Sequence, residues 1–365
     1  MNGTKSVIIV GGGIAGSVMA LELARSNIDV RVLESNTTFI QKPGECLPPV
    51  IRPLLKKLQL YHLLQRHQKS YGNKSLWGNS KLQEDHFIHS VNGYGTHIHR
   101  GEFEAHLSEE AKKAGATWLS GCSMTGIRRQ GDQWVVSAKL KGESKEFSAD
   151  FMVDASGKRA VVAKHLGFNR VWSDKLVAIT ALLHGEPLRD TTTLIEATPQ
   201  GWWYSASLPN QQLIISYMTD GDLIQHQLAH QTDGWTQLLE QTDQTKKRFH
   251  TSQVREMTDD LLTLKVHQAC SSRLEKISGT GWIAIGDAAC TFDPISSYGI
   301  TAAMGAAYYG SCAIKSNFRQ APESLATYHY LMDQMYGNCQ QLIRATYQQE
   351  KRWASNTFWA RRLNK

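Results

Sequence analysis

The chain has 365 residues, of which 41% are hydrophobic and 20% are charged. This length predicts two closely packed lobes, or one large α/β body with an elaborated second sheet. The composition excludes an intrinsically disordered chain. The formal net charge is +7, but the basic residues are dispersed, which favours a solvated surface over nucleic-acid binding. The same charge would steer an acidic protein partner towards the surface.

The apolar stretch at residues 6–24 could be mistaken for a signal peptide or a membrane span. Glycines at positions 11–13 and 16 and the charge of Glu22 interrupt it, so we reject both interpretations and expect a cytoplasmic protein that does not bind membranes. The six cysteines form no CxxC pair and have no clustered histidines. They predict free thiols, with neither a disulfide scaffold nor a metal site.

The first predicted element is a buried strand of β-branched residues, Val7–Val10, which runs directly into glycine. A helix over residues 17–24 follows the G-x-G-x-x-G pattern, so backbone N–H groups at the helix start can receive a pyrophosphate. The nucleotide-binding residues predicted here are Gly11, Gly13, Ile14, Ala15 and Gly16.

The second predicted strand, Val30–Leu33, ends at Glu34. A carboxylate at this position accepts hydrogen bonds from ribose hydroxyls and repels a 2′-phosphate, which favours FAD or NAD over NADP. A glycine motif alone could be a tight turn in any α/β protein. Strand, glycines, helix, strand and acid in sequence predict nucleotide binding, but they leave the choice between FAD and NAD open.

Three later segments have the same strand-then-turn character. Residues 151–157 are an apolar strand followed by an acid, Asp154, and a glycine turn at Gly157, and residues 282–289 contain a Gly-Asp pair at Asp287. Residues 293–300 form a proline turn, in which Ser296 or Ser297 could cap a helix over residues 301–314. Such a helix start would stabilise negative charge, although a small-residue helix after a proline turn is also common packing.

In this order the segments resemble those of FAD-dependent aromatic monooxygenases and tryptophan halogenases, which implies FAD as the cofactor. The resemblance implies that Asp287 bonds the ribityl chain. Residues 44–49 resemble a flavin-contacting segment of that group, and residues 97–103 resemble its strand-to-helix element in which an arginine contacts FAD. The further FAD contacts implied are Glu45, Arg100, Asp154, Gly157, Pro294, Ser297, Gly299 and Ile300.

The resemblance also implies an α/β fold with a discontinuous, Rossmann-type FAD-binding domain like that of group A flavoprotein monooxygenases. This domain would comprise residues 1–71, 97–169 and 270–320. An inserted, mainly antiparallel β substrate domain would comprise residues 72–96 and 170–269. Residues 321–365 would form a C-terminal helical segment.

An aromatic segment in the second sheet, Trp202, Trp203 and Tyr204, resembles the strand that lines the substrate side in halogenase-like proteins. The alternative is that Trp202 and Trp203 fill the core on opposite sides of the sheet. The basic, aromatic C-terminus likewise allows a partner-binding surface, although its pattern favours a helix docked by its aromatic residues.

Within that group the chain resembles the flavoproteins that mature quinone-bearing amino-acid oxidases, such as those of the lysine ε-oxidase and glycine oxidase systems. The resemblance implies an FAD-dependent monooxygenase that hydroxylates a tryptophan of an oxidase precursor during cysteine tryptophylquinone biosynthesis. Reduced FAD would react with O2 to form a C4a-hydroperoxide, with electrons from NAD(P)H or a separate reductase. The cofactor performs the difficult chemistry, so no catalytic acid or base is assigned.

Several alternatives remain open. A flavin-dependent halogenase would carry W-x-W-x-I-P and a reactive lysine, whereas Trp202 is followed by Trp203 and neither Lys74 nor Lys81 lies in a recognisable motif. A small-molecule aromatic hydroxylase or a non-catalytic FAD-bound maturation chaperone would share every motif named above. An NAD-dependent dehydrogenase would explain the first two strands but not residues 287–299.

Overall fold

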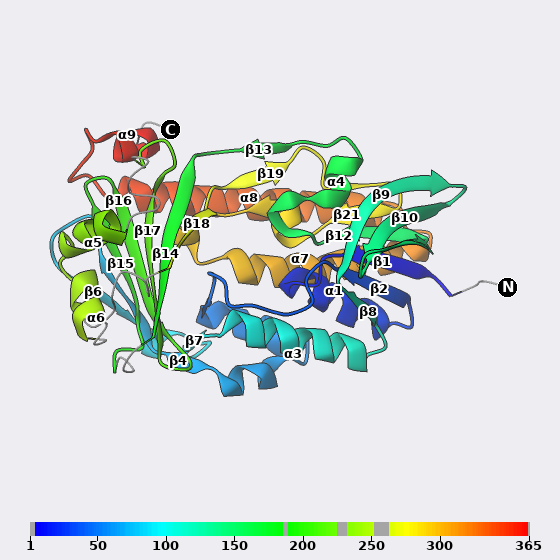
Figure 1. The fold of residues 1–365 in the computed structure, drawn as a ribbon, viewed down its shortest axis with the longest axis horizontal. Coiled ribbons are helices and arrows are strands. Elements are labelled where there is room, and N and C mark those ends of the chain that lie inside the picture. Colours follow the sequence, from blue (N-terminus) through cyan, green and yellow to red (C-terminus); the bar gives the residue numbers. More distant parts are fainter. Residues whose placement is uncertain (1–3, 185–188, 225–231, 252–262, 364–365) are drawn as a thin grey trace.

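The protein is described from a computed structural model, in which residues 4–184, 189–224, 232–251 and 263–363 are described. Two large sheets lie towards opposite ends of an elongated molecule, and the long helices α7 (Gly299–Phe318) and α8 (Glu323–Gln348) run between them (Figure 1). The junction between the sheets is therefore built from segments far apart in the sequence.

The N-terminal sheet has the strand order β20-β21-β12-β1-β2-β8. Its neighbouring strands are parallel except for the short antiparallel pair β20 and β21. Strand β1 is buried on both faces, which explains its run of Val and Ile. The bounds are β1 (Ser6–Val10), β2 (Asp29–Glu34), β8 (Thr117–Ser120), β12 (Phe151–Asp154), β20 (Ser278–Gly279) and β21 (Trp282–Ala284).

Helix α1 (Ile14–Ala24) is buried along its whole length except at Glu22. It packs against α3 (Arg100–Lys113) and α7, and α7 packs against α8. Its small side chains permit this close approach of neighbouring backbones. As a result the glycine-rich start of α1 faces the elements that follow β12 and β21.

The second sheet has the order β18-β14-β17-β16-β15-β5-β6 and is antiparallel except for the parallel pair β15 and β5. Helices α5 (Thr232–Glu240) and α6 (Thr245–Thr251) lie on its outer side (Figure 1). The bounds are β5 (Gly72–Leu76), β6 (Gln83–His86), β14 (Leu176–His184), β15 (Thr193–Thr198), β16 (Gly201–Leu208), β17 (Gln212–Asp220) and β18 (Leu264–Gln268).

Three small antiparallel sheets complete the strands of the described residues. They are β3 (Cys46–Leu47), β7 (Gly95–His97) and β4 (Gln68–Ser70); β9 (Cys122–Gln130), β10 (Gln133–Leu140) and β11 (Glu143–Ala149); and β13 (Arg170–Trp172), β19 (Ser272–Leu274) and β22 (Cys290–Thr291). The remaining helices are α2 (Arg52–Lys57), α4 (Val161–His165) and α9 (Thr357–Leu363), with short 3-10 turns η1 (Pro49–Ile51), η2 (Tyr61–Arg66), η3 (Phe87–His89), η4 (Gly157–Arg159), η7 (Gly286–Ala288) and η8 (Pro294–Ser296).

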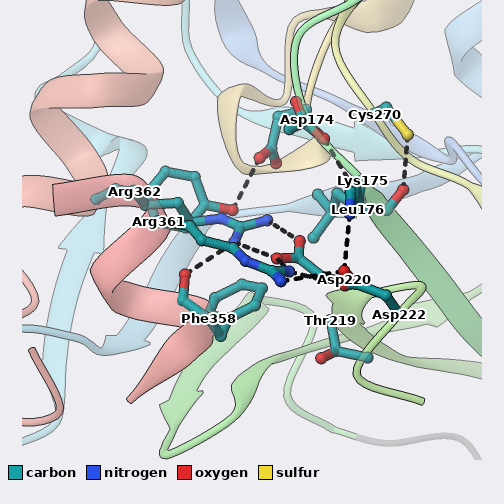
Figure 2. A network of polar contacts seen from close by, with 12 residues as sticks. Asp174, Lys175, Leu176, Thr219, Asp220, Asp222, Cys270, Phe358, Arg361 and Arg362 are labelled. Atoms are coloured by element: carbon teal, nitrogen blue, oxygen red, sulfur yellow. Dashed lines mark hydrogen bonds and ion pairs between the residues drawn. The ribbon is translucent and has the colours of Figure 1, made fainter. Parts of the chain in front are cut away.

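The C-terminal helix α9 is docked on the second sheet through buried aromatic residues and ion pairs. Phe358 and Trp359 are fully buried. The Arg362 guanidinium lies 2.6 Å from Asp220 at the end of β17 and stacks on the Phe358 ring at 3.6 Å, while Arg361 bonds Asp220 and Asp222 (Figure 2). This arrangement confirms the predicted docked helix.

The architecture confirms the predicted α/β class, with a Rossmann-type sheet, a mainly antiparallel second sheet and C-terminal helices. All six cysteines lie in the described residues and are free thiols, as predicted. Among the described helices, none combines the length and the apolar character required to cross a membrane.

Candidate active site

The adenosine end of the site is predicted at the tight turn between β1 and α1. Gly11 has a φ of +104°, and a Cβ atom there would lie 2.3 Å from the Ala155 carbonyl oxygen. A Cβ atom on Gly16 would lie 1.9 Å from the Gly11 carbonyl oxygen. Only glycine therefore permits this approach of α1 to the loop after β12.

Glu34 ends β2 beside this turn. Its carboxylate accepts hydrogen bonds from the Gly12 N–H at 2.7 Å and from the Asn36 N–H at 2.8 Å. The side chain is only 9% exposed, so these bonds fix its position at the edge of the glycine turn. That is where the sequence places the ribose of the cofactor.

Two helix starts fit an anionic or electron-rich ligand. Neither α1, with Gly13 at its N-cap, nor α7, with Tyr298, has a side-chain cap or an acidic residue in its first turn. Apart from the adjoining residues and the backbone of its own helix, no described atom lies within 4 Å of a Cβ placed on Gly13 or on Gly299. Uncapped N–H groups facing open space suit a pyrophosphate at α1 and the ring of a reduced flavin at α7, so these residues fit FAD.

The predicted segments converge at one place. A Cβ atom on Gly286, in turn η7, would lie 2.8 Å from the Ala15 side chain of α1 and 3.5 Å from that of Ala303 in α7. The Gly-Asp turn after β21 is thus packed between the two helix starts. Ile14 and Ala15 of α1, together with Ile300 of α7, border the same junction, and Ile14 and Ile300 are buried there.

The loop after β12 is shaped by Asp154, which is fully buried. Its carboxylate accepts hydrogen bonds from the Ser156 hydroxyl at 2.5 Å and from the Ala163 N–H at 2.9 Å. Burial raises the pKa of Asp154, and these bonds oppose the rise. Asp154 therefore holds the turn that contains Gly157, whose φ is +69°.

Turn η7 is held from the opposite side by Arg170 of β13. Its guanidinium donates to the carbonyl oxygens of Asp287 and Ala288 at 2.8 and 2.7 Å. Within the described residues, no hydrogen bond engages the Asp287 carboxylate, and the side chain is half-buried. The carboxylate is thus positioned through its backbone and is available to a ribityl hydroxyl.

The predicted serine cap of α7 is wrong. The helix begins at Gly299 with Tyr298 as its N-cap, and Ser297 has a φ of +49°, in the left-handed region. Ser296 instead donates its hydroxyl to the Asp293 carbonyl oxygen at 2.8 Å. The serines shape turn η8 and leave the N–H groups at the start of α7 uncapped.

A buried chain of hydrogen bonds connects this turn to the second sheet. The Trp202 indole N–H of β16 donates to the Tyr347 hydroxyl of α8 at 3.0 Å, and that hydroxyl donates to Asp293 at 2.8 Å. The other Asp293 carboxylate oxygen accepts from the Ile295 N–H at 2.9 Å. Asp293 therefore links turn η8 to α8 and to the substrate sheet.

Burial raises the pKa of Asp293 to about 7, and repulsion from Asp174 adds to the rise. The unfolded-state pKa is about 3.9. The folded protein therefore binds this proton more tightly than the unfolded chain, so the associated stability is complete below about pH 4 and is lost as the pH rises through 7.

We expect Asp293→Asn to remove this pH dependence. Relative to the variant, the wild type should lose up to ~4 kcal/mol of unfolding free energy between pH 4 and pH 8, at about 1.4 kcal/mol per pKa unit. Urea unfolding of both apoproteins at a series of pH values measures the difference. Parallel curves for the two proteins would show that Asp293 titrates normally.

The flavin-contacting segment predicted at Glu45 is held by Arg100. The Arg100 guanidinium donates to the Gly44 carbonyl oxygen at 2.9 Å and lies 2.6 Å from the buried Glu104 carboxylate. Its Nε atom is buried and has no hydrogen-bond partner among the described residues. Arg100 thus orients the loop of Glu45 and keeps one donor available for a ligand.

Glu45 itself is 2% exposed. Its carboxyl group accepts from the Gly44 N–H at 2.8 Å and from the Tyr204 hydroxyl of β16. Burial raises the pKa of Glu45, and burial beside Glu45 raises that of Tyr204. A buried carboxyl group and a buried phenol therefore meet where the FAD-side segment contacts the second sheet.

A second contact crosses the same boundary. The His97 ring, which is buried, bonds the Ser207 carbonyl oxygen at 2.8 Å and the Thr193 hydroxyl at 3.1 Å, and the Cys46 thiol lies 3.6 Å from that hydroxyl. Burial lowers the pKa of His97 to about 4, so the ring is neutral. Among the described residues, no cluster of His, Cys, Asp or Glu could hold a metal.

The two tryptophans of the aromatic segment point to opposite faces of β16 and are fully buried. Trp202 packs at 6.3 Å from Trp77 on the side of α8, and Trp203 packs at 5.2 Å from Trp235 on the outer side. Both are core residues, as the alternative interpretation of the sequence has it. Tyr204, which contacts Glu45, is the member of the segment that reaches the candidate site.

Sequence reasoning missed Asp293, Tyr347, Thr193 and Arg170. An Asp before Pro294 is a recognisable turn signal and could have indicated Asp293. Tyr347 and Arg170 act through partners more than 50 residues away, at Asp293 and Asp287, and no local pattern reveals such contacts.

Comparison with known proteins identifies the family. The sequence pattern of the tryptophan halogenase family matches residues 6–90 and 70–365. The chain is 29% identical, over 97% of its length and 96% of the relative's, to the putative FAD-dependent oxidoreductase LodB of Marinomonas mediterranea.

Two solved structures share the fold. The myxobacterial chondrochloren halogenase CndH has a TM-score of 0.86 at 20% identity, covering 98% of this chain and 86% of that one. The peptidyl tryptophan dihydroxylase QhpG, essential for tryptophylquinone cofactor biogenesis, has a TM-score of 0.80 at 19% identity. The match covers 98% of this chain and 78% of that one. The family match confirms the predicted flavin-dependent oxidoreductase with FAD as its cofactor. The chain belongs to the tryptophan halogenase family.

Proposed function

We propose that this protein is an FAD-dependent monooxygenase that hydroxylates a tryptophan side chain in the precursor of a partner amino-acid oxidase, during cysteine tryptophylquinone biosynthesis. The main support is similarity along almost the whole chain to LodB, together with the fold shared with a peptidyl tryptophan dihydroxylase. We assign the reaction to the junction between the two sheets, where Glu45 accepts a hydrogen bond from Tyr204.

The reaction consumes O2, two electrons and two protons. One oxygen atom replaces an indole hydrogen as a hydroxyl group, and the other leaves as water. The electrons come from NAD(P)H or from a separate reductase. Bound FAD supplies the activation of O2, and the protein supplies positioning and electrostatic stabilisation.

The cofactor contacts are part of this proposal. The N–H groups at the start of α7 would stabilise the reduced ring, and Glu34 would hold the ribose. The buried Glu45 and Tyr204 pair would keep water out on the substrate side. The residues proposed to contact FAD are Gly11, Gly13, Ile14, Ala15, Gly16, Glu34, Glu45, Arg100, Asp154, Gly157, Asp287, Pro294, Ser297, Gly299 and Ile300.

Halogenation is the second candidate, and the family match favours it. Of the two lysines considered from the sequence, Lys74 of β5 lies 3.3 Å from Glu84 and 3.2 Å from Asp190. Ion pairing with two carboxylates makes its amine a poor acceptor for hypohalous acid. We therefore expect Lys74→Ala to leave oxygen transfer unchanged, whereas in a halogenase that relies on this lysine it would abolish halogen transfer.

Co-expression with amino-acid oxidase precursors tests the function. The intact mass of the precursor should increase by one or more oxygen atoms when the flavoprotein is present, at a tryptophan located by peptide mapping. A halogenase would add halogen mass in the presence of chloride or bromide. A maturation chaperone would leave the mass unchanged, which would contradict the proposal.

A further inference from the structure

One stretch of the chain has an unusual charge pattern. Residues 50–71 contain Arg52, Lys56, Lys57, Arg66 and Lys69 but no aspartate or glutamate. This stretch begins directly after the flavin-contacting segment of Glu45 and comprises η1, α2, η2 and β4. A run of like charge is usually a solvated face, so the positions of these cations in the structure decide whether they form a surface.

Three of the five cations converge on two tyrosines. The Arg52 guanidinium lies 4.9 Å from the Tyr61 ring and 3.9 Å from the Tyr94 ring. Lys56 also lies over Tyr61, at 5.5 Å, and Lys69 lies over Tyr94, at 4.9 Å. Among the described residues, no carboxylate forms an ion pair with these three cations. We call this group the basic-aromatic surface.

Exposed apolar side chains border the basic-aromatic surface. The Tyr71 ring lies 6.1 Å from that of Tyr94 and is 55% exposed. The Tyr71 carbonyl oxygen accepts the Phe87 N–H at 2.8 Å, which holds the next turn, η3, beside it. In and after that turn, Ile88 and Val91 are 85% and 99% exposed. Apolar residues next to unpaired cations are typical of an interaction site.

The surface is continuous with the candidate active site. Tyr94 directly precedes β7, in which Thr96 pairs with Leu47 and His97 pairs with Cys46 of β3. The Arg52 guanidinium donates to the Tyr94 carbonyl oxygen at 3.1 Å, which connects α2 to the same strand. A polypeptide bound here would therefore lie near β3 and β7, which carry Cys46 and His97, and near Glu45, which directly precedes β3.

We propose that the basic-aromatic surface docks an acidic segment of the protein substrate. The inference rests on the proposed function, since only a polypeptide substrate needs a docking site beside the flavin. Charge complementarity selects an acidic partner. Stacking on tyrosine leaves each cation free to pair with a carboxylate. An anionic membrane is the competing ligand of such a surface, and the experiment below distinguishes it.

Peptide binding to the FAD-bound protein tests the proposal. The probe is a fluorescent peptide with one tryptophan flanked by glutamates, and the comparison peptide carries lysines instead. Fluorescence anisotropy should show that the acidic peptide binds and that raised salt weakens it. Lys56→Glu with Lys69→Glu should weaken binding by about tenfold or more through like-charge repulsion. The milder Lys56→Gln with Lys69→Gln should weaken it less, in the same direction.

The matched control is Lys139→Glu with Lys164→Glu. These exposed lysines lie on β10 and α4, towards the end of the molecule away from the second sheet (Figure 1), and their reversal should change the dissociation constant less than about twofold. An equal loss in the control would overturn the proposal. The proposal would also be overturned if Lys56→Glu with Lys69→Glu lost binding to anionic phosphatidylglycerol vesicles and still bound the acidic peptide as the wild type does. Binding needs no turnover, so absence of oxygen transfer would count against the proposed function alone.

Discussion

Replacing Gly13 with valine is expected to give a folded protein that no longer retains FAD. A Cβ atom at Gly13 meets no described atom within 4 Å, and the residue has an extended conformation with a φ of −71°, so valine does not strain the chain. Its side chain fills the space before the uncapped start of α1, which the pyrophosphate requires. We expect FAD affinity to fall by about 100-fold or more, equivalent to ~3 kcal/mol.

Gly16→Ala is the contrasting variant, because its Cβ atom would lie 1.9 Å from the Gly11 carbonyl oxygen. It should destabilise the apoprotein itself, whereas Gly13→Val should melt near the wild-type temperature. Thermal melting of the apoproteins and FAD titration by flavin fluorescence measure the two effects separately. Tight FAD binding by Gly13→Val would disprove the assigned position of the pyrophosphate.

Replacing Tyr347 with phenylalanine is expected to destabilise the protein strongly. The variant leaves the Trp202 indole N–H and the Asp293 carboxyl group, both buried, without the partner they share. Each unsatisfied buried group costs ~1–3 kcal/mol, so the loss for the two groups should be ~2–6 kcal/mol. Because Asp293 precedes turn η8, the visible spectrum of bound flavin and its reduction potential should also shift.

Tyr328→Phe is a matched control, since Tyr328 lies on the same helix, is equally buried and also donates one hydrogen bond, at 2.8 Å to the Ala284 carbonyl oxygen. It should cost ~1–2 kcal/mol and leave the flavin potential close to that of the wild type. Equal shifts in potential for both variants would mean that Tyr347 only stabilises the fold. Chemical denaturation and spectroelectrochemistry provide the two measurements.

The adenosine end of the site was predictable because its determinants are local. The strand, the glycine turn, the helix and the acid all lie within residues 7–34. The buried strand requires apolar residues, the close approach of backbones requires glycine, and the ribose requires a carboxylate. The structure brings Gly11, Gly16 and Glu34 together at the turn between β1 and α1. The start of α7 was also local, although its cap was mispredicted because Ser297 adopts a left-handed conformation instead.

The ring and substrate sides were less predictable, because their contacts join distant parts of the chain. Nothing near Glu45 in the sequence indicates Tyr204, and nothing near Asp293 indicates Tyr347. The alternation of Trp202 and Trp203 on a strand predicts opposite faces. The sequence does not show what covers each face. Helix α8 covers the face of Trp202, and α5 covers the face of Trp203 through Trp235.

A single-turnover reaction tests the central claim most directly. The FAD-bound protein, reduced without air, is mixed with the oxidase precursor and isotopically labelled O2, and the precursor is then analysed by mass spectrometry. The account predicts labelled oxygen on one tryptophan, in proportion to the flavin oxidised. Complete reoxidation of the flavin with no label in the precursor, at any tryptophan, would contradict it.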